Sequence, residues 1–430
     1  MAQRSYRDPL HNIISLDEST ADNRLIVELV DSTEFQRLRR IKQLGLAMFT
    51  YPGAEHSRFT HSLGVMHLMS RALDLLGAHH RIDEEARMAG RAGALLHDLG
   101  HGPFSHLIEK VFLFRHEDWT RRIILDEGTE VNRILRSYDR ELPAKLISLY
   151  NHVYAPAFIS QLVSSQLDCD RMDYLLRDSF MTGVKYGVYD LEWVLHALAI
   201  DETSDRLYVE AKGLHAVEEY LQARYYMFRQ VYFHRTLRSA EAVLVSTLAR
   251  ARHLIESGKA GLLTHAAAFE KMLVGKQVTT EEYLQLDDTN IIYSLKEWSS
   301  DSDPILSDLA RRFVDRKLFK AADLEAPAER LDQFWNKARE AVRAAGFDPE
   351  YYLIKDRAAD IPYYGYYLPG ASDPEGLIYV EAGAGERGVR EISEVSEVIR
   401  GMRAYTIDRV CFPAEVSDDI LALLAESRSA

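Results

Sequence analysis

The stretches HSRFTHSLGVMHL (56–68), LLHDLGHGPFSH (95–106) and LDCDRMDYLLRD (167–178) concentrate the histidines and acids of this chain. Apolar residues recur at three- and four-residue spacing over 61–76 and 84–99, which predicts a helix in each segment. The glycines and proline of GHGP (100–103) end the second helix, so His97 and Asp98 are expected in its last turn. The sequence therefore predicts a helical scaffold that carries clustered histidines and carboxylates.

The rest of the chain extends the helical pattern and then departs from it. Further helices are predicted over 25–44, 157–176, 191–198 and 214–250, with one short strand at 206–211. Later segments resemble strands at 351–354, 376–381 and 409–412, with a helix over 391–402. We therefore predict a mainly α fold. A helical core over 1–255 precedes a smaller mixed α/β lobe over 256–430, which is expected to serve oligomerisation or regulation.

Composition excludes several classes of protein. With 430 residues, 47% hydrophobic and 27% charged, the chain is typical of a folded globular protein. It has no apolar run of the roughly 18 residues that a membrane span needs, and its start does not resemble a secretion signal. Cys169 and Cys411 provide no disulfide framework, which favours a reducing, cytoplasmic location. The net charge of −14 argues against nucleic acid as a partner, although it is compatible with a local basic groove.

Four residues form a candidate metal site: His61, His97, Asp98 and Asp170. Imidazole and carboxylate ligands suit divalent or transition metals, so Fe, Mn, Mg, Ni, Co and Zn are all candidates. Such a set leaves coordination positions free for water and for a phosphate oxygen. A single His-Asp pair occurs about once by chance in a chain of this length, but histidines are crowded between residues 56 and 116. The crowding favours a metal-dependent phosphohydrolase. For His67, His79 and His80 taken singly, a structural role is the better interpretation.

The order H…HD…D in these stretches resembles the HD superfamily of metal phosphohydrolases. Within it, YPGAEHSRFTHSLGV (51–65), LLHDLGHGPFSH (95–106) and DCDRMDYLLRD (168–178) together are similar to the deoxynucleoside triphosphate triphosphohydrolases. That branch includes the vertebrate SAM-and-HD-domain protein and bacterial relatives. The similarity runs from DPLH (8–11) through STEFQRLRRIKQLG (32–45) to RYYMFRQVYFHRT (224–236), with a weaker echo at DRKLFK (315–320).

The resemblance implies a role for each matching position. The four metal ligands would be those named above, and Arg58 would grip a phosphate. His106 would be the general acid that protonates the leaving 5′-oxygen, supported by His101, His116 and Glu117. The residues around the sugar, base and triphosphate would be Gln43, Leu44, Arg171, Tyr174, Asp178, Arg224 and Tyr232. The implied reaction attacks the α-phosphorus of a dNTP and gives a deoxynucleoside and triphosphate.

Three positions depart from the family pattern. Phe228 and Phe233 replace the His and Gln of better-known members, and Arg171 replaces a Lys. The metal chemistry is unaffected by these changes, but they leave the identity of the substrate open. Simple core packing is the favoured interpretation of the two phenylalanines.

The resemblance also implies a GTP or dNTP effector bound at a subunit junction, and a homo-oligomer that is a dimer or a tetramer. The positions that match readers of the effector are Arg4, Asp31, Gln36 and Arg39, and those that match contacts to its phosphates are Lys212, Arg316 and Lys320. Glu210 stands where a basic residue is expected, so a second effector phosphate fits less well. Ordinary surface charge on amphipathic helices is an equally good interpretation of these residues.

Two alternatives stay open. One keeps the metal site but changes the substrate to a phosphomonoester, a cyclic or alarmone nucleotide, or a nucleic-acid 3′ end. The other is a nucleotide-sensing scaffold with little turnover. A complete ligand set beside a candidate acid at His106 favours an enzyme over a pure binding module.

Overall fold

Helices make up most of the molecule, which confirms the prediction of a mainly α fold. The computed structural model describes residues 3–259, 261–263, 266–363, 377–382 and 388–428. The helices of its first part are α1 (Ala21–Asp31), α2 (Thr33–Arg37), α3 (Arg58–Gly77), α4 (Glu84–Leu96), α5 (His106–Phe112), α6 (His116–Leu125), α7 (Glu130–Tyr138), α8 (Leu142–Tyr150), α9 (Ala157–Val163), α10 (Cys169–Thr182), α11 (Leu191–His196), α12 (Leu214–Met227) and α13 (Arg235–Glu256). Those of the later part are α14 (Ala267–Leu273), α15 (Thr280–Leu284), α16 (Asp288–Trp298), α17 (Pro304–Val314), α18 (Ala328–Ala344), α19 (Pro349–Tyr352), α20 (Ile392–Val395), α21 (Glu397–Gly401) and α22 (Ser417–Arg428).

Three small sheets accompany the helices. A hairpin consists of β1 (Gln3–Asp8) and β2 (Asn12–Asp17). A second sheet has the order β3 (Leu198–Asp201), β4 (Arg206–Val209), β7 (Tyr379–Glu381) and β8 (Val389–Glu391), in which only β4 and β7 are parallel. The third has the order β5 (Lys320–Asp323), β9 (Tyr405–Phe412) and β6 (Ile354–Asp360), all antiparallel.

Some of the predicted elements are wrong in extent or type. The helix predicted over 25–44 stops at Asp31, because Ser32 is extended and its hydroxyl caps α2. The helix predicted over 157–176 is split into α9 and α10, and the Asp168 carboxylate caps the second. A single helix over 214–250 is likewise interrupted by a π-helical turn at Phe228–Tyr232. The strand predicted at 351–354 begins only at Ile354, because Tyr351 and Tyr352 end the short helix α19, which Asp348 caps.

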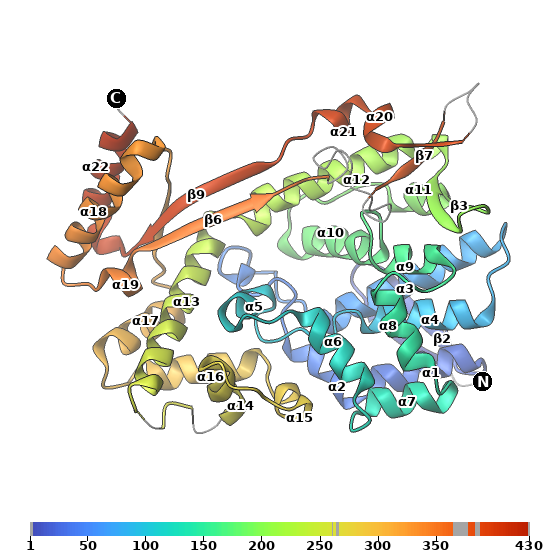
Figure 1. Cartoon of the computed structure of the whole chain (residues 1–430), viewed down its shortest axis with the longest axis horizontal. Coiled ribbons are helices and arrows are strands. Elements are labelled where there is room, and N and C mark those ends of the chain that lie inside the picture. Colours follow the sequence, from blue (N-terminus) through green and yellow to red (C-terminus); the bar gives the residue numbers. More distant parts are fainter. Residues whose placement is uncertain (1–2, 260, 264–265, 364–376, 383–387, 429–430) are drawn as a thin grey trace.

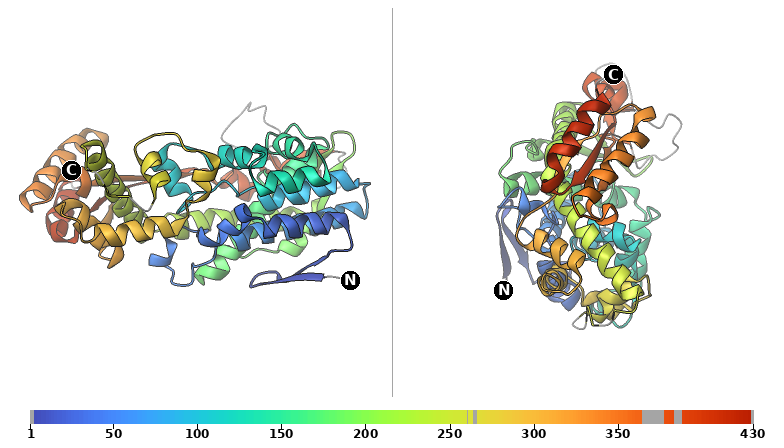
Figure 2. Two further views of the ribbon diagram at one scale, coloured as in Figure 1. Left: turned by 90° about the horizontal axis from the view of Figure 1, so that it is seen from below. Right: turned by 90° about the vertical axis from the view of Figure 1, so that its left-hand side faces the viewer.

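The molecule is elongated, and its two ends differ in architecture (Figures 1 and 2). At one end α1–α12 gather, with α3 packed on both α4 and α10. Helix α13 leads to the other end, where it packs on α17, and where α18 and α22 pack on each other. Strands β6 and β9 run back between the two ends (Figure 1). In the residues described, no helix has the length and apolar character needed to cross a bilayer.

The apolar interior consists of two clusters. One surrounds α3, α10 and α12 and includes Met172 and Tyr220. The other joins Leu95 of α4 to Phe313 of α17 and Leu424 of α22. This second cluster contains residues from both sides of residue 255, so the two predicted parts share buried apolar surface. The boundary at 255 stays a prediction.

Candidate metal-dependent active site

Three helices bring the candidate ligands together. His61 lies in the first turn of α3, His97 ends α4 as its C-cap, and Asp170 lies in the first turn of α10. The close contact of α3 with α10 depends on Gly64, because a Cβ at that position would lie 2.0 Å from the Asp173 carboxylate. Glycine is therefore required for the two ligand-bearing helices to meet.

The ligand atoms converge on one point. His61 Nε2 lies 3.0 Å, and His97 Nε2 3.7 Å, from Oδ1 of Asp170. The ligand atoms of these three side chains all lie within 4.8 Å of one another. Asp98 contributes Oδ1 at 3.3 Å from His97 Nε2, and Oδ2 at 3.7 Å from His61 Nε2. The four residues proposed as ligands thus form a single cluster.

Each imidazole presents Nε2 to this cluster because its Nδ1 is engaged elsewhere. Nδ1 of His61 lies 2.8 Å from Oδ2 of Asp173, and Nδ1 of His97 lies 2.8 Å from the carbonyl oxygen of Ala94. A proton on each Nδ1 satisfies these contacts and leaves both Nε2 lone pairs for a metal. The buried Nε2 of His97 has no hydrogen-bond partner. An orphaned imidazole nitrogen beside two carboxylates fits a divalent or transition metal.

Asp98 is kept ionised inside the protein by the charges around it. Its side chain is buried, which alone would raise its pKa, but Arg58 and the neighbouring His97 and His101 hold that pKa well below its usual range. Arg58 pairs with Asp98 through Nη1, and its Nε donates a 2.8 Å hydrogen bond to the Ser105 hydroxyl. The guanidinium is thereby fixed at the edge of the ligand cluster, where it can neutralise a phosphate.

Three histidines surround one carboxylate next to the ligand cluster. Oε1 of Glu109 lies 3.3 Å from Nδ1 of His101 and 3.1 Å from Nδ1 of both His106 and His116. Burial opposes ionisation of Glu109, but these histidines lower its pKa below the usual range. Burial and then Arg58 lower the pKa of His101 to about 3, so that its ring is neutral. The side chain of His106 is 65% exposed, which leaves it accessible to a substrate.

Both clusters open into one cavity of about 830 Å³, a size typical of small-molecule sites. The predicted site residues that line it are Gln43, Leu44, Arg58, His97, Asp98, His101, His106, His116, Glu117, Asp170, Arg171, Tyr174, Asp178 and Tyr232. Phe228 and Phe233 also line it and are only half-buried, so the interpretation of both as simple core residues is wrong. Three of the four proposed metal ligands, the candidate acid and the residues predicted to bind the sugar thus line one cavity. His61 is not among the lining residues, but it belongs to the same ligand cluster.

Two predicted residues have other partners. Arg224 is not at the cavity: its guanidinium pairs with Asp360 at 3.0 Å and lies 4.5 Å from the centre of the Phe228 ring. It therefore packs against Phe228, which is a residue of the cavity wall. Glu117 does line the cavity, but it is bound by Arg115 at 3.0 Å and lies 3.6 Å from His116.

The residue patterns did not assign a role to two acids that the fold places at the centre of the site. Glu109 joins the three histidines, and Asp173 fixes the His61 ring. Each lies three residues after a predicted site residue on the same helix, His106 and Asp170, and residues at that spacing share a helix face. The spacing was a usable signal for both.

Comparison with known proteins agrees with this geometry. The chain matches the HD domain over residues 58–178 and the HD associated region over 189–262. The uncharacterized protein YwfO of Bacillus subtilis is 39% identical over 97% of this chain and 94% of its own length. The deoxynucleoside triphosphate triphosphohydrolase SAMHD1 homolog of Dictyostelium discoideum is 32% identical over 54% of this chain, which spans 47% of that relative. A solved phosphohydrolase structure from Bacteroides thetaiotaomicron is 30% identical with a TM-score of 0.81, over 96% of this chain and 100% of that chain.

The helical scaffold, the ligand cluster and these matches define a class of hydrolytic metalloenzymes, the HD-domain phosphohydrolases, and the chain belongs to that family. Its relatives include proteins named as deoxynucleoside triphosphate triphosphohydrolases, the branch that the three sequence motifs resemble. The predicted resemblance is therefore confirmed at the level of the family.

Proposed function

We propose that the chain hydrolyses a deoxynucleoside triphosphate to a deoxynucleoside and triphosphate. The observation that carries this proposal is the single cavity that joins Asp98 and Asp170 of the ligand cluster to the exposed His106 and to Tyr174 and Asp178. The relatives named as deoxynucleoside triphosphate triphosphohydrolases support the same substrate class. When bound, the metal supplies a Lewis acid and an activated water, which the proposed hydrolysis needs.

The chain's own residues perform the remaining steps. Arg58, held by Asp98 and Ser105, neutralises charge on the α-phosphate as the bond to the 5′-oxygen breaks. His106 gives its proton to that oxygen from Nε2, because its Nδ1 lies against Glu109. The carboxylate of Glu109 stabilises the protonated imidazole before transfer.

Sugar recognition is assigned to Asp178 and Tyr174 on α10. Oδ1 of Asp178 lies 2.7 Å from His56 Nε2, and its Oδ2 accepts a 2.8 Å hydrogen bond from the Tyr232 hydroxyl. Each oxygen keeps a second lone pair for a sugar hydroxyl, so Asp178 can accept from the 3′-hydroxyl. Phe228 and Phe233 offer aromatic surface against which a base can stack.

One incubation tests the reaction. Purified protein is mixed with each dNTP, with Mn²⁺ or Mg²⁺ and with or without GTP, and the products are separated by ion-exchange chromatography. Free deoxynucleoside with intact triphosphate supports the proposal. Release of phosphate or pyrophosphate excludes it and points to another phosphoester, whereas no turnover with any metal favours the nucleotide-sensing scaffold.

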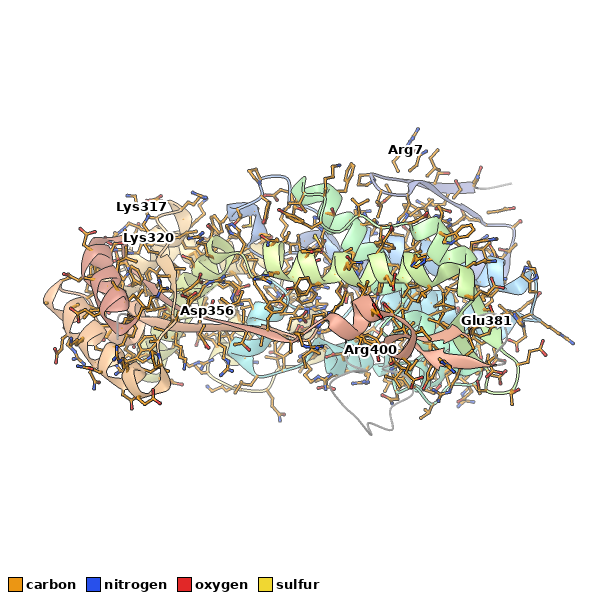
Figure 3. The ribbon with its side chains drawn as sticks, turned by 90° about the horizontal axis from the view of Figure 1, so that it is seen from above. Arg7, Lys317, Lys320, Asp356, Glu381 and Arg400 are labelled. Carbon is orange, nitrogen blue, oxygen red and sulfur yellow. The ribbon has the colours of Figure 1, made fainter. Side chains whose placement is uncertain are left out.

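We also propose an effector site shared between copies of the chain. Arg4 pairs with Asp31 at 3.0 Å, and Arg39 donates to Gln36 at 2.8 Å. Arg4 belongs to strand β1, which also carries Arg7. Lys320 and Lys317 lie far from Arg7, toward the other end of the long axis of the molecule (Figure 3).

The remaining predicted contacts of the effector phosphates also have partners of their own. Arg316 donates to the carbonyl oxygen of Phe49 at 2.7 Å, and Lys212 pairs with Glu210 at 2.6 Å. One nucleotide that touches both the β1 end and Lys320 therefore requires two copies of the chain. Activity that does not respond to GTP or dNTP at any concentration would remove this part of the proposal.

A further inference from the structure

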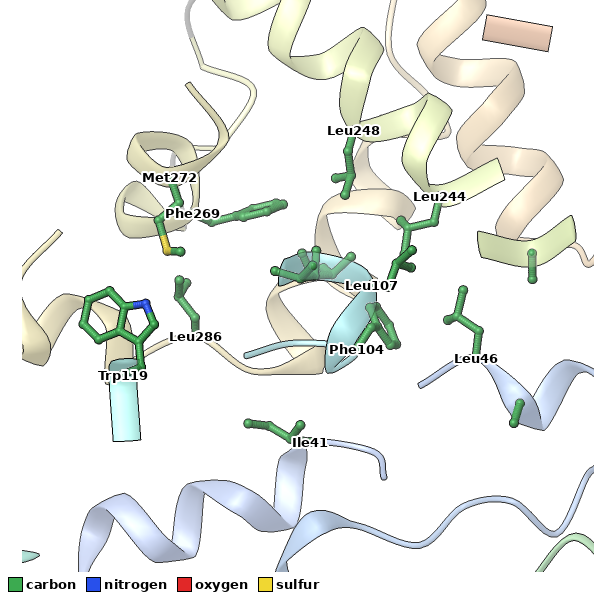
Figure 4. Close-up of a cluster of buried hydrophobic side chains, with 14 of the residues drawn as sticks. Ile41, Leu46, Phe104, Leu107, Trp119, Leu244, Leu248, Phe269, Met272 and Leu286 are labelled. Carbon is green, nitrogen blue, oxygen red and sulfur yellow. The ribbon is translucent and has the colours of Figure 1, made fainter. Parts of the chain in front are cut away.

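The turn before His106 has a strained backbone. Phe104 and Ser105 have φ values of +49° and +56°, in the left-handed region that residues with a Cβ rarely adopt. Such a backbone conformation is unfavourable and persists only where its surroundings enforce it. The Phe104 ring is buried in the core beside Leu107, with Ile41 and Leu46 nearby (Figure 4). Apolar packing fixes the ring, but the backbone of the turn needs a separate anchor.

Asp288, the first residue of α16, provides that anchor. Its Oδ1 accepts a 2.7 Å hydrogen bond from the Phe104 amide, and its Oδ2 accepts a 2.9 Å hydrogen bond from the Lys42 amide. The side chain is 7% exposed, and burial raises its pKa to about 6, so it is mostly ionised at neutral pH and both oxygens accept. The Ser105 hydroxyl closes the ring by donating to the Lys42 carbonyl oxygen at 3.1 Å.

These two backbone segments touch each other, since a Cβ at Gly45 would lie 3.3 Å from the Phe104 carbonyl oxygen, and residues of both line the cavity. Lys42 precedes Gln43, which lines the sugar side, and Phe104 precedes Ser105 and His106 on the acid side. Ser105 also accepts the hydrogen bond from Arg58 Nε. One carboxylate therefore sets the position of the phosphate-binding guanidinium and the candidate acid relative to the sugar pocket.

A second contact from the same part of the chain supports this arrangement. The Tyr283 hydroxyl donates to the Gly100 carbonyl oxygen at 2.5 Å, and the Tyr283 ring stacks on Trp119 at 3.8 Å. Arg37 is buried and donates from Nε to the Leu286 carbonyl oxygen at 2.8 Å. The segment 283–288 lies beyond the matched HD regions. It holds the loop between α4 and α5, here called the catalytic loop, at Gly100 through Tyr283 and at Phe104 through Asp288.

We propose that Asp288 is a positioning residue, which holds the strained Phe104–Ser105 turn so that His106 and Arg58 are aligned for the reaction. Because it touches backbone amides and no reacting group, its effect passes through the turn. Only the expected change in kcat rests on the proposed function. The hydrogen bonds from Asp288 to the turn do not depend on which substrate is hydrolysed.

The test compares Asp288→Ala and Asp288→Asn with Asp287→Asn. Asp287 is the neighbouring N-cap of α16, equally buried, and pairs with Arg40 instead of the catalytic loop. Asparagine retains the cap, so this variant removes a carboxylate charge at the same helix end and leaves the hydrogen bonds of Asp288 in place. Amide exchange in the peptide covering residues 100–107 is measured by mass spectrometry, and kcat and KM are measured with a dNTP.

We expect Asp288→Ala to accelerate exchange in that peptide about tenfold and to lower kcat about 10- to 100-fold, with KM changed less than about threefold. Asp288→Asn, with one acceptor left, should fall between Asp288→Ala and the wild type, and it serves as the test if the alanine variant does not fold. Asp287→Asn should resemble the wild type in both measurements.

Two results would overturn the proposal: unchanged exchange and kcat in both Asp288 variants, or an equal loss in Asp287→Asn. A wild-type protein that hydrolyses no dNTP refutes the proposed function instead. The exchange measurement then still decides whether Asp288 holds the turn.

Discussion

The metal-facing histidines of this site are fixed by atoms that never touch the metal. Nδ1 of His97 is satisfied by the chain's own backbone, whereas Nδ1 of His61 depends on the Asp173 side chain. Asp173 also pairs with Arg177 and with His11, so its carboxylate is held from three sides. The two ligands therefore differ in how easily their orientation is lost.

Removing a ligand should abolish metal binding and activity together. Asp170→Ala and His97→Ala each delete an atom of the cluster, and we expect less than about a tenth of the wild-type metal content and turnover in each. Metal content by mass spectrometry and turnover of a dNTP are the measurements. His79→Ala, in the exposed turn that follows α3, is the control. Full metal content and full turnover in both ligand variants would refute the site assignment.

Asp173→Asn should weaken metal binding without removing a ligand. The amide can no longer accept strongly from the His61 ring, and loss of such a partner typically costs about 10- to 100-fold in metal affinity or activity. Titration with a competing chelator measures the affinity. Affinity equal to that of the wild type would show that the backbone of α3 alone orients the ring.

His67 should make the protein sensitive to acid. Burial, followed by the charge of His11, lowers the pKa of His67 in the folded protein to about 4. Between about pH 6.5 and pH 4 the unfolded chain binds a proton that the native state does not, so native stability falls as the pH falls. The wild type should lose more free energy of unfolding between pH 7 and pH 5 than His67→Gln does, and we expect the difference to be about 1 kcal/mol. This value is reduced because the His67 side chain is partly exposed to solvent.

Urea unfolding of metal-free protein at the two pH values measures the effect. His79→Gln, exposed in the turn that follows the helix of His67, should leave the difference unchanged. Equal pH dependence in the His67 variant and the wild type would contradict the expectation.

At the scale of elements, α10 carries much of the site, since Asp170, Tyr174 and Asp178 all lie on it. The helix begins with the Asp168 cap and ends at Gly183, whose φ of +79° closes it in the left-handed conformation. The sequence predicted this helix from its apolar spacing but joined it to α9, because a capping aspartate inside an apolar stretch leaves the periodicity almost unchanged.

Gly183→Ala should destabilise the protein through the backbone alone. A Cβ at Gly183 meets nothing within 4 Å, so the cost is that of a left-handed alanine, about 1 kcal/mol. Gly401→Ala is the matched control, because its Cβ also meets nothing and its φ is not positive. Urea midpoints compare the two. Equal midpoints would show that the end of α10 adapts without strain.

Other elements show where sequence patterns stop being informative. The convergence of His61, His97, Asp98 and Asp170 was predictable because three short motifs carry them, and the mainly α fold followed from helical periodicity. The spacing from His106 was a signal for Glu109 itself. Its contacts with His101 and His116, and the contact of Asp288 with Phe104, were not predictable, since they depend on how separate elements dock. The cavity position of Phe228 was missed for the same reason, because an aromatic residue has the same spacing on a core face and on a pocket wall.

At the scale of the whole molecule, strand β1 and Lys320 lie far apart, so the proposed effector site takes one of them from each of two copies. Two variants that each lack one half of this site should therefore restore each other's response when they are mixed. Arg4→Ala and Lys320→Ala should each abolish stimulation by GTP while leaving basal turnover intact. A pair made of one copy of each variant has two effector sites. One of them combines both substituted residues, and the other combines the intact Arg4 of one copy with the intact Lys320 of its partner, so about half of the stimulation should return in each mixed pair. Turnover against GTP concentration, for each variant and for the mixture, is the measurement. If mixing restores nothing, the two groups do not share a site.

The bond between Asp288 and Phe104 also sets an order of events during biosynthesis. A ribosome adds about 5–20 residues per second, so the last ligand, Asp170, exists roughly 5–25 s before Asp288 does. During that interval a nascent chain carries a complete ligand set and a loop that lacks its anchor. The proposed hydrolysis should therefore stay about 10- to 100-fold below its full rate until Asp288 has emerged and has docked on the turn.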